Sequence, residues 1–148
     1  MSKIIGIDHG SVRIGIAVSD DGSTVAFGRE AIQGKDAVKA ISYIKKLAAE
    51  ENASIIVIGY PLNLKAEKTK QTGEVELFQE KLKEEFLKEP VYDIKIVRWD
   101  ERFTSKMALD SQLESGMKKK RRQDKSNLDI TSAAIMLQSY LDSLKRIT

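Results

Sequence analysis

The hydrophobic positions of the chain change from strand-like patterns near the N-terminus to helical spacing further on. A mostly apolar run at residues 4–7 predicts a buried strand, which ends in Asp8 and a glycine turn. Residues 13–19 alternate between apolar and polar or small side chains, which predicts a second strand returning beside the first. A third strand is predicted at residues 25–32, so the chain is expected to begin with three antiparallel strands.

Strands and helices alternate through the middle of the chain. Apolar stripes at helical spacing predict one helix over residues 36–51 and another that Pro90 terminates. The continuous apolar run at residues 55–58 predicts a parallel strand buried on both faces, and residues 94–99 predict a further strand. Strand–helix units of this kind add parallel strands to a sheet.

The C-terminal third is predicted to be helical. A short helix is expected between an N-cap at Thr104 and Gly116. The last helix, opening at Asp129, has the strongest period, with an apolar stripe made of Ile130, Ala133, Ala134, Leu137, Leu141 and Leu144. The order β-β-β-α-β-α-β-α-α is that of the ribonuclease H-like fold, an α/β mixed sheet of three antiparallel and then two parallel strands flanked by helices. Because neither a linker nor a repeat interrupts the pattern, residues 1–148 are predicted to form a single domain.

Composition and charge narrow the class of protein. An apolar fraction of 41% over 148 residues suffices for a globular core, and the absence of cysteine excludes disulfides and thiolate metal sites. No apolar run approaches ~20 residues and no signal peptide precedes the first strand, so we expect a soluble cytoplasmic protein with no membrane partner. The net charge of +3 includes five adjacent cations: Lys118, Lys119, Lys120, Arg121 and Arg122. Such a segment suits a polyanionic partner, and we expect it to contact a nucleic-acid backbone.

Carboxylates at three places in the predicted fold are candidate metal ligands. Asp8 ends the first strand, Asp100 and Glu101 end the last, and Asp129 opens the final helix on the side that faces the sheet. Clustered carboxylates repel one another without a cation, and hard oxygen ligands select Mg²⁺ or Mn²⁺. Two such ions can activate water and stabilise the leaving oxygen of a phosphodiester, so the predicted activity is that of a nuclease. Strand alternation leaves open whether Asp100 or Glu101 points inward.

Other polar residues near these carboxylates have weaker signals. Arg13 and Arg102 could neutralise a phosphate near the metals, and Arg102 could equally hold Glu101 in place. His9, the single histidine, adjoins Asp8 and is interpreted as a turn residue that faces solvent.

Four stretches of the chain resemble the YqgF family of ribonuclease H-like proteins, which is related to bacterial Holliday junction resolvases. They read GIDHGSVRIGIAVSD (6–20), IGYP (58–61), WDERFTS (99–105) and DITSAAIMLQSYL (129–141), in the family's order. The resemblance implies a role in maturing the 5′ end of pre-16S ribosomal RNA. It also implies that Asp8, Glu101 and Asp129 are the metal-binding acids, with Asp100 the alternative to Glu101.

One loop departs from the family's pattern. After Gly-x-Pro the family usually carries a glycine-containing loop, whereas residues 64–69 contain no glycine. The departure puts the substrate contacts of this loop in doubt, although it leaves the three acids untouched.

The sequence leaves other functions open beside a Mg²⁺-dependent nuclease that acts on structured RNA. A DNA junction resolvase would use the same acids, normally as a symmetric homodimer rather than a monomer. An actin-like nucleotide-binding module would also place Asp-x-Gly after the first strand, but 148 residues are too few for its two lobes. A non-catalytic RNA-binding protein is the third alternative, because metal ligands do not prove turnover.

Overall fold

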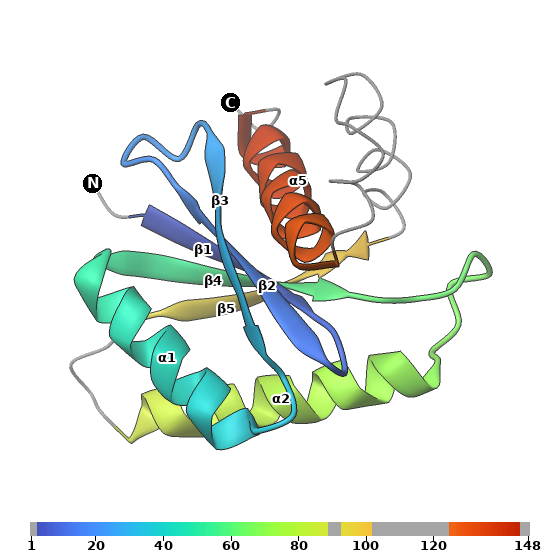
Figure 1. Ribbon diagram of the computed structural model, residues 1–148. Helices are drawn as coiled ribbons and strands as arrows, with labels where there is room; N and C mark the ends of the chain where they lie inside the picture. Colours follow the sequence, from blue (N-terminus) through green and yellow to red (C-terminus); the bar gives the residue numbers. More distant parts are fainter. Residues whose placement is uncertain (1–2, 89–92, 102–124, 146–148) are drawn as a thin grey trace.

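A five-stranded mixed sheet forms the centre of the computed structural model, which describes residues 3–88, 93–101 and 125–145 (Figure 1). The strands are β1 Lys3–His9, β2 Arg13–Ser19, β3 Ala26–Gln33, β4 Ala53–Tyr60 and β5 Lys95–Asp100. Their order across the sheet is β3-β2-β1-β4-β5. The first three strands pair antiparallel, and β4 and β5 extend the sheet in parallel from β1, which confirms the predicted ribonuclease H-like strand arrangement.

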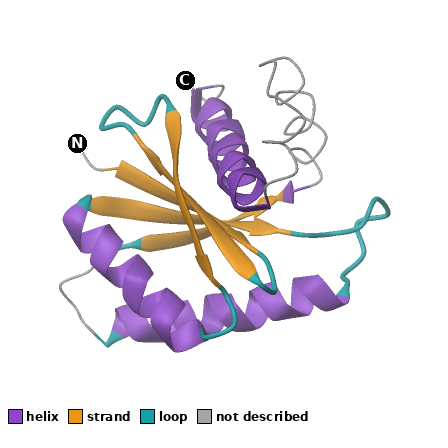
Figure 2. Cartoon of the chain, viewed as in Figure 1, coloured by secondary structure: helices purple, strands orange, loops and turns teal. Residues whose placement is uncertain are grey.

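Helices cover both faces of this sheet. The helices α1 (Ala37–Glu50) and α2 (Lys70–Leu87) lie on one face, and α5 (Lys125–Lys145) crosses the other (Figure 2). Because α5 already begins at Lys125, the predicted opening at Asp129 was one turn too late. The helix predicted between Thr104 and Gly116 lies outside the described residues.

Side-chain polarity explains where two of these helices begin. The side chain of Asp36 accepts a hydrogen bond from the Lys39 backbone N–H and caps α1. Thr69 and Thr72 form a reciprocal capping box at the start of α2. Such caps satisfy N–H groups that have no partner within the helix.

Strand alternation divides the core into two clusters. The isoleucines at positions 5, 7, 14, 16, 56 and 58 pack with α1 and α2. Ile4, Ala17 and Val57 face the opposite way and pack with α5. Because both faces are buried, the central strand β4 reads as a continuous apolar run rather than an alternating one.

Glycines let α5 approach the sheet closely. A Cβ atom on Gly15 would lie 2.2 Å from the carbonyl oxygen of Asp129, and one on Gly28 would lie 2.4 Å from the side chain of Ile130. The amide of Gln138 fixes the same helix further along, since it accepts from the N–H of Ala26 at 2.9 Å. The backbone of Asp129 therefore packs directly against β2 at Gly15.

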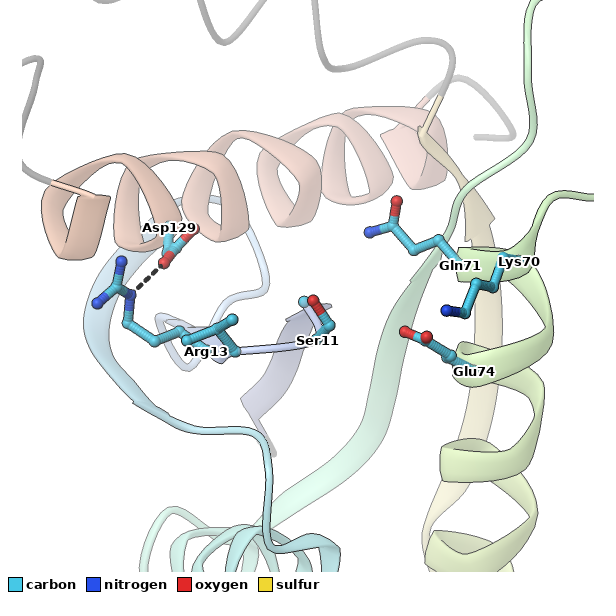
Figure 3. Close-up of a pocket in the computed structure, with 8 residues that line it drawn as sticks. Ser11, Arg13, Lys70, Gln71, Glu74 and Asp129 are labelled. Carbon is cyan, nitrogen blue, oxygen red and sulfur yellow. Dashed lines mark hydrogen bonds and ion pairs between the residues drawn. The ribbon is translucent and has the colours of Figure 1, made fainter.

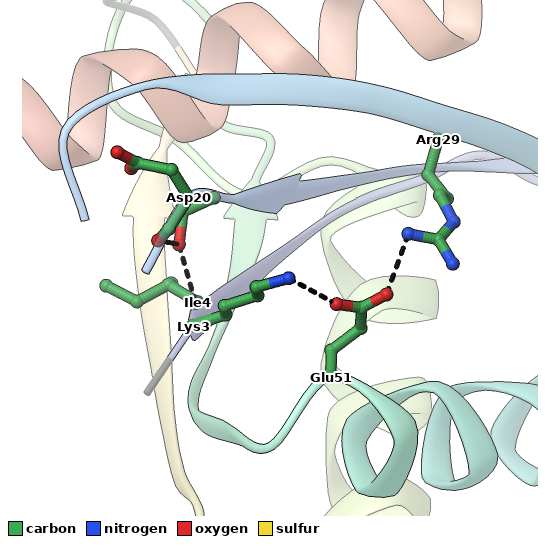
Figure 4. Close-up of polar contacts among 6 residues, drawn as sticks. Lys3, Ile4, Asp20, Arg29 and Glu51 are labelled. Atoms are coloured by element: carbon green, nitrogen blue, oxygen red, sulfur yellow. Dashed lines mark hydrogen bonds and ion pairs between the residues drawn. The ribbon is translucent and has the colours of Figure 1, made fainter. Parts of the chain in front are cut away.

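A polar cluster joins the sheet to the C-terminal end of α1 (Figure 4). Glu51 follows α1 and accepts hydrogen bonds from Lys3 at 2.7 Å and from Arg29 at 2.8 Å. The two cations lower the pKa of Glu51, which keeps the carboxylate charged. This cluster links β1 and β3 to the α1–β4 connection and is a structural feature.

Candidate active site

Asp8 and Glu101 meet on the face of the sheet that carries α5. Alternation along β1 places Gly6 and Asp8 on that face, and Trp99 of β5 packs there two residues before Glu101. The side chains of Asp8 and Glu101 are joined by a hydrogen bond. Glu101 is therefore the acid that reaches Asp8, whereas alternation along β5 places Asp100 on the opposite face.

Gly59 of β4 makes room for the Glu101 side chain. A Cβ atom at this position would lie 2.2 Å from Oε1 and 2.9 Å from Cγ of Glu101. Since β4 lies between β1 and β5 in the sheet, any side chain at position 59 would occupy the space through which Glu101 reaches Asp8. Gly59 is therefore a positioning residue that the sequence pattern did not single out.

We expect Gly59→Ala to displace Glu101 and reduce cleavage at saturating substrate at least tenfold, because even small misplacement of an active-site group is costly. The matched control is Gly73→Ala in α2, where an added Cβ has no neighbour within 4 Å. Gly73→Ala should raise the unfolding free energy by about 0.5–1 kcal/mol, because alanine favours a helix more than glycine does, and it should leave cleavage unchanged. Cleavage rates and thermal melts of both variants make the comparison, and an unchanged rate for Gly59→Ala would contradict this role.

Burial decides the protonation of the two acids. Burial raises the pKa of Glu101 to about 9, with further contributions from the charge of Asp8 and the hydrogen bond between them. Burial also raises the pKa of Asp8, although the hydrogen bond from Glu101 opposes that shift. At neutral pH Glu101 therefore keeps its proton and donates it in the hydrogen bond to Asp8.

Asp129 lies beside this pair and is held by an arginine. Its Oδ2 accepts a hydrogen bond from Nε of Arg13 at 3.1 Å, and its charge contributes to the raised pKa of Asp8. Within the described ranges, no group of three His, Cys, Asp or Glu side chains is close enough to hold a metal ion. The three-acid metal site of Asp8, Glu101 and Asp129 thus stays a prediction, with two members in contact and the third paired with Arg13.

The donor set of the acidic pair suits a divalent cation. Two buried carboxyl groups offer hard oxygen ligands, and they can both ionise only when a positive charge compensates them. A cation such as Mg²⁺ or Mn²⁺ would supply that charge, so the residues fit the metal that the family implies.

The expectation that His9 faces solvent was wrong. His9 is only 7% exposed, and its ring centroid lies 4.7 Å from that of Phe78 in α2. Burial lowers its pKa, so the ring is neutral at pH 7. The alternation of side chains along β1 could have predicted the burial of His9, because His9 lies on the same face as Ile5 and Ile7, opposite Asp8.

The glycine-poor loop before α2 has an ordered turn. The side chain of Asn63 accepts hydrogen bonds from the N–H groups of Lys65 and Glu67, both at 2.9 Å. Ala66 has φ 64°, in the left-handed region that glycine adopts most readily. The loop therefore keeps a glycine-type conformation without a glycine.

Ala66→Gly is expected to raise the unfolding free energy by up to about 1 kcal/mol, because it removes the left-handed strain of an alanine. Ala49→Gly, at an exposed position inside α1, is the control and should lower it by about 0.5–1 kcal/mol. Chemical denaturation of the two variants gives both values. A destabilised Ala66→Gly variant would show that the conformation of Ala66 carries no strain.

A cleft of about 550 Å³ lies beside Asp129 (Figure 3). One wall is lined by Ser11 in the turn between β1 and β2 and by Arg13 at the start of β2. The first turns of α2 line the other wall with Lys70 and Glu74. Asp129 belongs to the lining as well, so the cleft is continuous with the candidate active site. Apart from Arg13 and Asp129, these residues were not among the sequence-predicted site residues.

The remaining predicted nucleic-acid contacts lie outside the described residues. These are Arg102 and the segment Lys118, Lys119, Lys120, Arg121 and Arg122. Of the helices that the structure does describe, none combines the length and apolar character needed to span a bilayer.

Comparison with solved structures identifies the fold class of this protein. Solved structures that resemble this fold at low sequence identity include resolvases that act on Holliday junctions. RuvC of T. thermophilus, in complex with a Holliday junction substrate, has a TM-score of 0.60 at 12% identity over 97% of this chain and 96% of its own. The yeast mitochondrial Holliday junction resolvase Ydc2 has a TM-score of 0.58 at 11% identity over 99% of this chain and 82% of its own. The fold is therefore that of the ribonuclease H-like nucleases.

Sequence similarity then gives the family. The family model described as "RuvX: Holliday junction resolvase" matches residues 2–143. A relative from Flavobacterium psychrophilum is 38% identical over 95% of this chain and 97% of its own length, and one from Ruminiclostridium cellulolyticum is 36% identical over 96% and 95%. Both carry the name "Putative pre-16S rRNA nuclease". The chain belongs to the RuvX family and is a nuclease, which confirms the resemblance seen in its motifs.

Proposed function

We propose that this protein is a divalent-metal-dependent nuclease that matures the 5′ end of pre-16S ribosomal RNA in the cytoplasm. The observation that carries the proposal is the buried pair of Asp8 and Glu101 at the carboxyl ends of β1 and β5, the parallel strands on either side of β4 in a ribonuclease H-like sheet. The shared name of relatives that match this chain from end to end supports the RNA substrate.

In this proposal Asp8, Glu101 and Asp129 hold Mg²⁺ or Mn²⁺. The bound ions supply an activated water and stabilise the leaving oxygen of the phosphodiester. Glu101 would hold the cation as a carboxylate, because a positive charge beside it would oppose the burial and the Asp8 charge that raise its pKa. Arg13 orients Asp129 through Nε and keeps its guanidinium beside the place of the scissile phosphate.

More distant cations complete the substrate contacts in this proposal. Arg102 follows Glu101 directly in the sequence, and the five cations at 118–122 precede Asp129. Contacts between these cations and phosphates would strengthen binding of all sequences alike and would weaken as the salt concentration rises.

A DNA junction resolvase is the second candidate, and the likeness to RuvC favours it. Such an enzyme must cut two strands at matching positions, which a symmetric dimer achieves. The two functions therefore differ in both the substrate and the oligomeric state.

The test is a cleavage assay with Mg²⁺ or Mn²⁺ on a 5′-extended 16S ribosomal RNA fragment and on a four-way DNA junction in parallel, with sedimentation measured under the same conditions. We expect one discrete cut near the mature 5′ end of the RNA, no paired cuts in the junction, and loss of cleavage in EDTA. Paired symmetric cuts by a dimer would establish the resolvase instead. Binding of RNA without cleavage in either metal would establish a non-catalytic protein.

A further inference from the structure

The cleft beside Asp129 has a cation on each of two walls, and the Arg13 guanidinium is turned toward Asp129. Lys70 projects from α2 on one wall, and Arg13 projects from the start of β2 on the other (Figure 3). Arg13 bonds Asp129 only through Nε among the described residues, so the ends of its guanidinium remain available to a second group. Lys70 is exposed and has no ion-pair partner in the part of the chain that the structure describes. Cations on both walls suit backbone phosphates.

The remaining lining residues indicate which part of a nucleic acid enters. Ser11 and Gln71 add a hydroxyl and an amide, groups that commonly contact phosphate and sugar oxygens. None of the described residues that line the cleft is aromatic, so this part of the lining offers no platform for stacking bases. Its volume of about 550 Å³ is in the range of a small-molecule pocket, enough for a nucleotide or two of one strand and too small for a duplex.

Glu74 is the unexpected group in such a cleft. Its carboxylate lies one helical turn beyond Lys70 on the same wall, where it would repel a phosphate placed close to it (Figure 3). A carboxylate accepts hydrogen bonds and donates none when ionised. The group of an RNA backbone that could donate to it is the ribose 2′-hydroxyl, which DNA lacks.

We propose that this cleft is a ribose-phosphate subsite for an unpaired RNA strand next to the scissile bond. Lys70 holds a backbone phosphate at the α2 wall, the free end of Arg13 holds the phosphate beside Asp129, and Glu74 accepts a hydrogen bond from a 2′-hydroxyl. The inference rests on the proposed function, because it assumes that an RNA strand cleaved at Asp8, Glu101 and Asp129 continues into the cleft. It adds the chemical basis on which the enzyme distinguishes RNA from DNA.

Binding is measured by fluorescence anisotropy in EDTA, so that cleavage does not consume the probe. The probes are a short fluorescein-labelled oligoribonucleotide, its 2′-deoxy counterpart of the same sequence, and the duplex of the ribonucleotide strand. We expect the wild-type protein to bind the single RNA strand about tenfold more tightly than the DNA strand, and more tightly than the duplex.

Variants separate the two parts of the subsite. Glu74→Ala should bring the RNA-to-DNA affinity ratio close to one, whereas Glu74→Gln, which keeps an acceptor oxygen, should retain part of it. Lys70→Gln should weaken both strands equally and reduce the slope of log affinity against log salt by about 0.7. The matched control is Lys83→Gln, which makes the same change at an exposed position about 20 Å along α2.

Three results would overturn the subsite. They are an unchanged RNA-to-DNA ratio in both Glu74 variants, equal affinities for strand and duplex, and equal salt slopes for Lys70→Gln and Lys83→Gln. Cleavage assays of the same proteins with Mg²⁺ keep the two proposals distinct. A wild-type protein that cleaves RNA while Glu74 has no effect would refute only the subsite. A protein that shows the expected affinity ratios but never cleaves would refute only the proposed nuclease function.

Discussion

Asp8→Asn is expected to reduce metal-dependent cleavage about 10³-fold while the fold persists. The substitution removes an anionic ligand, and loss of metal-ion stabilisation worth about 4 kcal/mol in the transition state corresponds to that factor. Without metal the variant should melt at the same temperature as the wild-type protein or higher, because Asn is neutral and still accepts the hydrogen bond from Glu101.

Cleavage rates and thermal melts, each with and without Mg²⁺, test this prediction. Asp21→Asn, the same chemical change in an exposed turn, is the control and should leave both quantities unchanged. Mg²⁺ should raise the melting temperature of the wild-type protein and of Asp21→Asn but have little effect on Asp8→Asn. A large loss of stability in metal-free Asp8→Asn would mean that Asp8 has a structural role.

Without metal the protein should become less stable as the pH rises from 7 to 8.5. Glu101 has a folded-state pKa of about 9, above its ordinary value of 4.5, so in this range the folded protein holds a proton that the unfolded chain has lost. Stability from this group is therefore fully present below pH 4.5 and is lost as the pH approaches 9, with a slope of up to about 1.4 kcal/mol per pH unit. The measurement starts at pH 7 because the pKa of His9 is lowered in the folded protein. Below pH 7 this group makes the protein more stable as the pH rises, which would oppose the effect of Glu101.

Denaturation curves at several pH values, in EDTA and in Mg²⁺, measure this slope. Glu101→Gln cannot ionise and should remove most of it, while Mg²⁺ should stabilise the wild-type protein more at pH 8.5 than at pH 7. If Glu101→Gln and the wild-type protein give parallel pH profiles in EDTA, then Glu101 is ionised without metal and does not donate a hydrogen bond to Asp8.

The order of strands and helices could be predicted from the sequence because periodicity is a local property. Alternation in residues 13–19 and the apolar run at 55–58 reflect how many faces of each strand are buried. The acids at the strand ends were visible for the same reason, since a carboxylate that closes an apolar run needs compensation. Helix boundaries were less certain, and α5 begins one turn earlier than its apolar stripe suggested.

Other features depend on which elements pack on which face, and no local pattern contains that information. The choice of Glu101 over Asp100 follows from α5 covering the face on which Asp8 and Trp99 lie, and from the space that Gly59 leaves. The burial of His9 follows from the position of Phe78 in α2, which is far away in the sequence. The sequence by itself determined the order of strands and helices along the chain, the family and the set of candidate acids. Only the tertiary structure decided which acids touch, where their proton lies and which side chains line the cleft, because burial and charge at these positions arise from residues brought together by folding.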